Sequence, residues 1–324
     1  MIVGILTAGA LLGGGAAGVL YLVKKKRPRL VSENIPECLG ILEQVPMEGL
    51  LNQLETALDP GFIQQVKKRY LKENPKKTED EFEWCWFELK RYFLLTSLLR
   101  KAPMFSEEVD EIWHQMILFT QKYQTFSEQF LGSMLHHTPN TTLKPEPQER
   151  AFFDWVFSQL FSITELSWKT WGDFFKHPIS NRILKEFKEQ SSEWLMNKYF
   201  KVTKENEATV EYLVIQMKKQ LAEVDLIHPE NKKGTFPKQQ TFGEMRQLSL
   251  MMVFFSYYHF DDYWTHAKVY AMANASKYTS GCSTAVFCGH ASHSHDSNHG
   301  GHEDHGSGSD SGSSCSSCGG GCSS

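Results

Sequence analysis

An uncharged, apolar run at its beginning limits the structures that this chain can form. Residues 2–23 read IVGILTAGALLGGGAAGVLYLV, and five basic residues follow within 24–29. About 20 apolar residues suffice for a helix to cross the hydrocarbon core of a bilayer. A cleaved signal peptide, the alternative, carries basic residues before a shorter apolar stretch. We therefore expect a single transmembrane helix over 1–23 and a basic juxtamembrane linker over 24–35.

The basic cluster and the glycines of this run carry two further expectations. Basic residues concentrate on the cytoplasmic side of a span, so Lys24–Arg29 predict an outside N-terminus and a cytoplasmic main domain. Gly9 with Gly13, and Gly14 with Gly18, form G-x-x-x-G pairs, a spacing that lets two membrane helices approach closely. Either the chain forms a homo-oligomer through these glycines, or they reflect the small residues common in membrane spans.

Between its two atypical ends the chain has the composition of a folded helical domain. The whole chain is 41% hydrophobic and 13% aromatic, which is rich enough to build a core. Its net charge of −4 argues against nucleic acid as a partner, because nucleic-acid binders present a strongly basic face. We expect one multi-helix globular domain over 36–278, followed by a disordered tail over 279–324.

Helix signals recur through this middle region, whereas no stretch alternates apolar and polar residues long enough to predict a sheet. Thr78 and Glu81 form a capping box ahead of the segment 81–100, and Ser106 caps the next helix. Further helices are predicted over 149–160, 181–200, 207–224 and from 241 into the 260s, the last containing the apolar core run 248–260. The predicted class is all-α, and a small irregular or strand element is compatible with it.

Residues 89–139 contain a recognisable pattern. It consists of VDxxWHxxIL at 109–118, then Tyr123, Phe126 and Gly132, and HHxP at 136–139. This pattern resembles the glycine-rich domain-containing protein-like family of bacteria and plants, whose bacterial members tend to end in a Gly- and Cys-rich tail, like CSSCGGGCSS at 315–324 here. The resemblance implies an α-helical domain but no established reaction or ligand. Many relatives have Cys where this chain has Ser127.

The same motif offers candidate metal ligands. Asp110 and His114 lie four residues apart on one helical face, and His136 and His137 follow about 20 residues later. One carboxylate and three imidazoles are a suitable ligand set for zinc or another transition metal. The structural alternative is that Asp110 merely holds the His114 ring and that the later histidines cap a helix. Trp113 is expected to be buried.

The tail carries a second set of candidate ligands. Cytoplasmic thiols stay reduced, and tracts rich in His and Cys bind Zn, Cu or Ni. The alternative is a flexible, solvated tail of low complexity. Cys85, inside a predicted helix, is expected to be a buried structural thiol. The tail ligands are His290, His293, His295, His299, His302, His305, Cys315, Cys318 and Cys322.

Three functions are consistent with these features. The first, which requires least of the residues, is a membrane-tethered interaction or scaffold domain with an unidentified protein partner. The second is metal binding or buffering by the tail, and the third is a membrane-bound, metal-dependent enzyme built on Asp110, His114, His136 and His137. The chain has no HExxH, nucleophile elbow or Gly-rich phosphate loop, so no catalytic residue is assigned.

Overall fold

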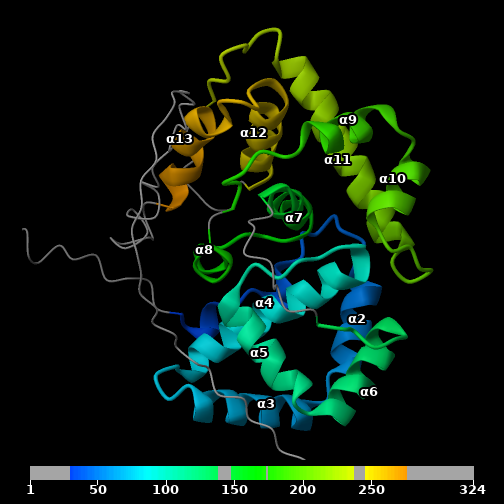
Figure 1. Ribbon diagram of the computed structural model, residues 1–324, viewed down its shortest axis with the longest axis vertical. Helices are drawn as coiled ribbons and strands as arrows, with labels where there is room; N and C mark the ends of the chain where they lie inside the picture. Colours follow the sequence, from blue (N-terminus) through cyan, green and yellow to red (C-terminus); the bar gives the residue numbers. More distant parts are fainter. Residues whose placement is uncertain (1–29, 138–146, 173, 237–244, 276–324) are drawn as a thin grey trace, which may run out of the picture. The chain divides into compact units, whose positions relative to one another are not determined.

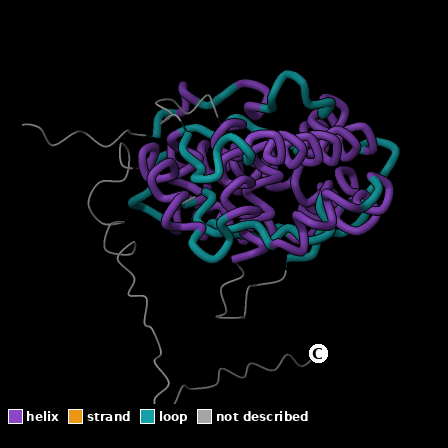
Figure 2. Tube along the Cα trace, turned by 90° about the horizontal axis from the view of Figure 1, so that it is seen from above, coloured by secondary structure: helices purple, strands orange, loops and turns teal. Residues whose placement is uncertain are grey.

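The computed structural model describes residues 30–137, 147–172, 174–236 and 245–275, and these residues form helices joined by loops (Figures 1 and 2). They contain no strand, only isolated bridges between Ile41 and Phe161 and between Leu99 and Phe200. The predicted all-α class is therefore confirmed. In chain order the elements are η1 (Ser32–Asn34), η2 (Glu37–Gly40), α2 (Glu48–Ala57), α3 (Pro60–Glu73), α4 (Glu79–Leu98), α5 (Glu107–Ile117), α6 (Thr120–Leu131), α7 (Pro147–Leu160), α8 (Glu165–Trp171), α9 (Asn181–Glu189), α10 (Ser192–Tyr199), α11 (Glu207–Ile227), α12 (Met245–Tyr258) and α13 (Tyr263–Ala275).

The membrane part of the sequence prediction is corrected. None of the helices in the described ranges combines the length and the apolar character that crossing a bilayer requires. The predicted span over 1–23, with its G-x-x-x-G pairs, and the basic linker up to residue 29 lie outside the described residues. This finding contradicts the predicted transmembrane helix, the single-pass topology and the cytoplasmic main domain.

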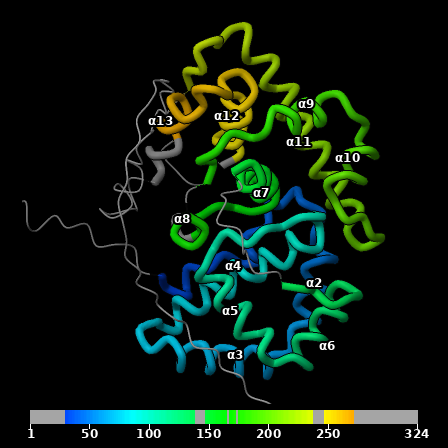
Figure 3. Tube along the Cα trace, in the orientation of Figure 1, coloured from blue at the N-terminus to red at the C-terminus, as the bar shows by residue number. Residues whose placement is uncertain are grey.

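The described helices pack in two groups that can be followed along the chain in Figure 3. In the first group, α4 packs against α2, α3 and α5, while α6 packs against α2 and α5. In the second group, α11 packs against α7, α9, α10 and α12, and α12 also contacts α13. Helix α8 packs on α4, and Leu42 donates a backbone hydrogen bond to Leu160 at 2.9 Å. The two groups therefore share one apolar core.

Helix α4 is the most deeply buried helix of the first group. The predicted capping box is present, because Thr78 Oγ1 accepts from the Glu81 N–H and Glu81 Oε2 accepts from the Thr78 N–H. Cys85 is buried as predicted, and burial raises the pKa of its thiol to about 12. At neutral pH this thiol is therefore protonated and poorly nucleophilic.

A buried ion pair fixes α4 to its neighbours. Arg91 Nη1 lies 3.4 Å from Glu88 Oε1, and both side chains are fully buried. Arg91 Nε donates to the Leu39 carbonyl at 2.7 Å, and Trp171 Nε1 donates to Glu88 Oε2 at 2.8 Å. Gly40 has a φ of +57°, and a Cβ there would lie 2.5 Å from Arg91 Nη2. The end of η2 therefore requires glycine for both its backbone angle and its closeness to the guanidinium.

Several helix boundaries differ from the sequence prediction. The motif residues from Val109 to Tyr123 are divided between α5 and α6, because the chain turns at Leu118 and Phe119, and Phe119 packs edge-on against Phe62 of α3. The segment predicted as one helix over 181–200 breaks before Ser191, whose side chain caps α10. The last predicted helix also divides into α12 and α13, whereas the helices α2, α3 and α8 were not predicted.

Candidate metal centre

Helix α5 presents two of the candidate ligands. Ser106 Oγ accepts from the Val109 N–H and so fixes the start of the helix. Asp110 and His114 then lie one turn apart, with Asp110 Oδ2 3.6 Å from His114 Nε2. This separation is too long for a hydrogen bond. The two side chains are therefore neighbours without a hydrogen bond between them.

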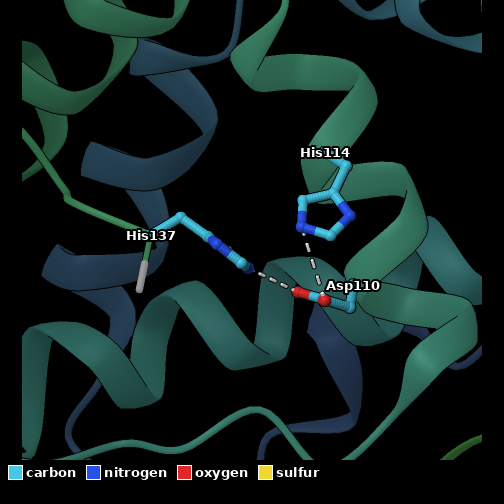
Figure 4. Close-up of side chains that lie close together, drawn as sticks. All are labelled: Asp110, His114 and His137. Atoms are coloured by element: carbon cyan, nitrogen blue, oxygen red, sulfur yellow. Dashed lines mark hydrogen bonds and ion pairs between the residues drawn. The ribbon is translucent and has the colours of Figure 1, made fainter. Parts of the chain in front are cut away.

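The third group is His137, which reaches the same carboxylate from beyond α6. Helix α6 ends at Gly132, whose φ of 70° is the left-handed conformation that closes many helices. The chain then returns towards α5, and His137 Nε2 makes a 2.7 Å hydrogen bond with Asp110 Oδ1. Figure 4 shows His114 and His137 both directed at the Asp110 carboxylate.

A buried aromatic network holds the segment that carries His137. Trp113 Nε1 donates to Tyr123 Oη at 2.8 Å, and Tyr123 Oη donates to the carbonyl of Leu135 at 2.8 Å. The Trp113 ring also meets the His137 ring edge-on, with 4.4 Å between their centres. Trp113 is 3% exposed, as the sequence predicted. The motif residues Trp113 and Tyr123 thus position a histidine that lies two residues beyond Leu135.

Polar contacts with α3 and with Asn74, the residue after it, fix the neighbouring face of α5. Asn74 Nδ2 donates to Glu111 Oε1 at 2.6 Å, and Arg69 Nε donates to Gln115 Oε1 at 2.7 Å. The Tyr92 ring packs against Trp113. Burial first and then the Asp110 charge raise the pKa of the Tyr92 phenol, and its hydroxyl donates to the Ala102 carbonyl. The Tyr92 phenol is therefore neutral and is not a candidate base.

The three ligand groups differ in their exposure to solvent. The side chain of His137 is 9% exposed, that of Asp110 25% and that of His114 50%. Their potential ligand atoms all lie within 4.8 Å of one another. An ion bound between them would be held by one imidazole at the core side and would face solvent beside His114. A three-ligand site of this kind leaves coordination positions for water or a small ligand.

The structure separates the predicted ligands into three sets. It brings Asp110, His114 and His137 together, whereas His136 is exposed and takes no part in this cluster. The later histidines do not cap α6, because Gly132 closes that helix, whereas Asp110 contacts both His137, at 2.7 Å, and His114, at 3.6 Å. The tail candidates, from His290 to Cys322, lie outside the described residues.

A second cluster of potential ligands was missed by the sequence analysis. His259, Asp262 and His266 also bring one ligand atom each to within 4.8 Å of the others. Their spacing H-x-x-D-x-x-x-H is visible in the sequence, but His259 lies within the apolar run 248–260, which was predicted to be part of one helix. The end of α12 at Tyr258 changes that interpretation, since it places His259 in the turn before α13.

The fold and the first cluster together define a helical protein with a His–Asp–His cluster at its surface. Residues 53–161, which include all three of its side chains, match the family described as UCP032817-like, a family without a characterised function. No curated protein and no solved structure matched the chain.

Proposed function

We propose that this protein binds one divalent transition metal ion through Asp110, His114 and His137. The observation that carries the proposal is the convergence of these three side chains from α5 and from the segment after α6. Two imidazoles and one carboxylate suit Zn²⁺, Cu²⁺ or Ni²⁺ better than Mg²⁺ or Ca²⁺, which prefer ligand sets made of oxygen.

The distances fit an ion of this class after small shifts. A tetrahedral zinc ion with bonds of about 2.0–2.1 Å requires ligand atoms about 3.3 Å apart. The 2.7 Å between Asp110 Oδ1 and His137 Nε2 and the 3.6 Å between Asp110 Oδ2 and His114 Nε2 involve different carboxylate oxygens and lie on either side of that value. Rotations of the His114 and Asp110 side chains, which are partly exposed, supply the difference.

The ordered surroundings of His137 also support a ligand role. Metal-binding histidines depend on neighbours that fix the ring. Here Trp113 packs against the ring and Tyr123 holds the chain that leads to it. The relation of this region to the glycine-rich domain-containing protein-like family is also part of the proposal, and it rests on the VDxxWHxxIL and HHxP motifs.

The test needs full-length protein in which the tail cannot bind metal. We define the tail-substituted protein as the full-length chain with every His and Cys beyond residue 275 replaced by Ser. Zinc binding to this protein would be titrated calorimetrically, in competition with a chelator that removes weakly bound ions. His114→Ala and His137→Ala are expected to abolish one binding event, whereas His136→Ala, which changes an exposed neighbouring ring, should retain it.

Equal zinc binding by the parent and by His114→Ala and His137→Ala would contradict the proposal. Circular dichroism of each variant distinguishes a lost ligand from a lost fold. An interaction domain without metal, the function favoured by the sequence, would give no binding event at this site in any variant. The same titration of the unmodified chain measures what the tail ligands add.

A further inference from the structure

We propose a second binding site for a divalent transition metal ion at His259, Asp262 and His266, in the turn between α12 and α13. Asp262 directly precedes α13, and its Oδ2 lies 3.0 Å from Nε2 of His266, one helical turn further on. His259 follows the last residue of α12, and its Nδ1 lies 3.9 Å from Asp262 Oδ1. Each carboxylate oxygen of Asp262 therefore faces one imidazole nitrogen.

The contact of His259 with an earlier loop sets which nitrogen is free to bind an ion. His259 Nε2 lies 3.2 Å from the carbonyl oxygen of Lys232. A carbonyl only accepts, so Nε2 carries the hydrogen and, in the neutral ring, Nδ1 carries a lone pair. Nδ1 then faces a carboxylate oxygen with no proton between them, an arrangement that a bound cation would stabilise. A backbone carbonyl that fixes the tautomer is a common partner of metal-binding histidines.

Aromatic rings hold both histidines in place. The His266 ring stacks on Phe255 at 22° with 5.6 Å between centres, and the His259 ring lies 5.9 Å from that of Phe254. The two imidazole rings are 4.2 Å apart. Their side chains are 18% and 26% exposed, whereas Asp262 is 58% exposed. The two imidazole rings are therefore held in place before an ion binds. The ion would enter from the solvent side, where the carboxylate lies.

The donor set defines the class of ion and its effect on the fold. Two imidazole nitrogens and one carboxylate oxygen favour zinc and its neighbours over magnesium or calcium. An ion there would join the end of α12 to the first turn of α13. Through His259 it would also hold the loop at Lys232, which follows α11. Its expected role is to stiffen this turn, with free coordination positions towards solvent.

The site can be tested in the tail-substituted protein that also carries His114→Ala, so that neither the tail nor the first cluster contributes. One equivalent of zinc is expected to bind. His266→Ala and Asp262→Asn should remove it, and Asp261→Asn, which changes the exposed carboxylate next to the cluster, should leave it unchanged. In hydrogen exchange, zinc should slow the amides of residues 255–270 in the parent but not in His266→Ala.

Two results would overturn the proposal. One is zinc binding that His266→Ala and Asp262→Asn both leave unchanged, since the ion would then lie elsewhere. The other is the absence of zinc binding in a protein whose circular dichroism matches that of the wild type. Because the first cluster is already disabled by His114→Ala, either result is independent of whether the first site binds metal.

Discussion

The two His–Asp–His clusters share one local sequence spacing but lie in different surroundings. Each has an Asp and a His four residues apart, Asp110 with His114 and Asp262 with His266, and each adds one further histidine. In the first cluster the further histidine arrives from beyond another helix and packs on buried Trp113. In the second it comes from the adjoining turn. The first cluster is therefore coupled to the core, whereas the second is coupled mainly to a local turn.

The largest effect should come from removing the aromatic ring beneath the first cluster. Trp113→Ala deletes a ring that is 3% exposed and contacts Tyr92, Phe93 and His137. The loss should lower the free energy of unfolding by about 3–5 kcal/mol, measured by chemical denaturation. Trp194→Ala, at a ring that is 39% exposed, is the control and should have a much smaller effect. Equal effects would contradict the coupling of the first cluster to the core.

The two carboxylates should differ in their contribution to stability when metal is removed with a chelator. Asp110→Ala leaves the largely buried His137 ring without its 2.7 Å partner, which should cost about 1.5–3 kcal/mol. Asp262→Ala removes a carboxylate that is 58% exposed, and such pairs are worth less than about 1 kcal/mol. Comparing the denaturation midpoints of the two variants tests this order. A larger loss of stability in Asp262→Ala than in Asp110→Ala would contradict it.

Removing the Tyr123 hydroxyl should lower the zinc affinity of the first cluster but not that of the second. Tyr123→Phe leaves Trp113 Nε1 and the Leu135 carbonyl without their shared partner, at a cost of about 1–2 kcal/mol in stability. It should also weaken zinc binding at the first cluster by about 10–100-fold, because the segment carrying His137 is less well held. Binding at the second cluster should be unchanged. An equal loss at both would indicate general destabilisation instead of positioning.

The smallest effect is expected at the histidine next to His137. His136 is exposed and takes no part in the cluster, so His136→Ala should change stability by less than about 0.5 kcal/mol and leave zinc affinity unchanged. Thermal unfolding with and without zinc would measure both quantities. A loss of zinc-dependent stabilisation in His136→Ala would show that the wrong histidine of the pair has been assigned.

Local signals in the sequence were enough to predict the all-α class and several helices. The Thr78–Glu81 capping box and the Ser106 cap are both present, because a side chain that satisfies free N–H groups acts within one turn. A comparable signal at α3 was overlooked, where Asp59 caps the helix and Pro60 occupies its first position. The break between α5 and α6 depends instead on packing of Phe119 against Phe62, which local sequence does not reveal.

The candidate site could be predicted only in part for the same reason. The four-residue spacing of Asp110 and His114 follows from helical geometry. The choice between His136 and His137 depends on how the chain turns after Gly132 and on the bond from Tyr123 to Leu135, which are tertiary features. Likewise, His259 joins Asp262 and His266 only because α12 ends at Tyr258.

The binding of one metal ion by Asp110, His114 and His137 can be observed directly in crystals. Anomalous diffraction at the zinc absorption edge, from crystals of the tail-substituted protein grown with zinc, tests it most directly. We expect an anomalous peak about 2.0–2.1 Å from Nε2 of His114, Nε2 of His137 and an oxygen of Asp110. The contradictory result would be no peak there in zinc-loaded crystals, with the 2.7 Å hydrogen bond between Asp110 and His137 intact.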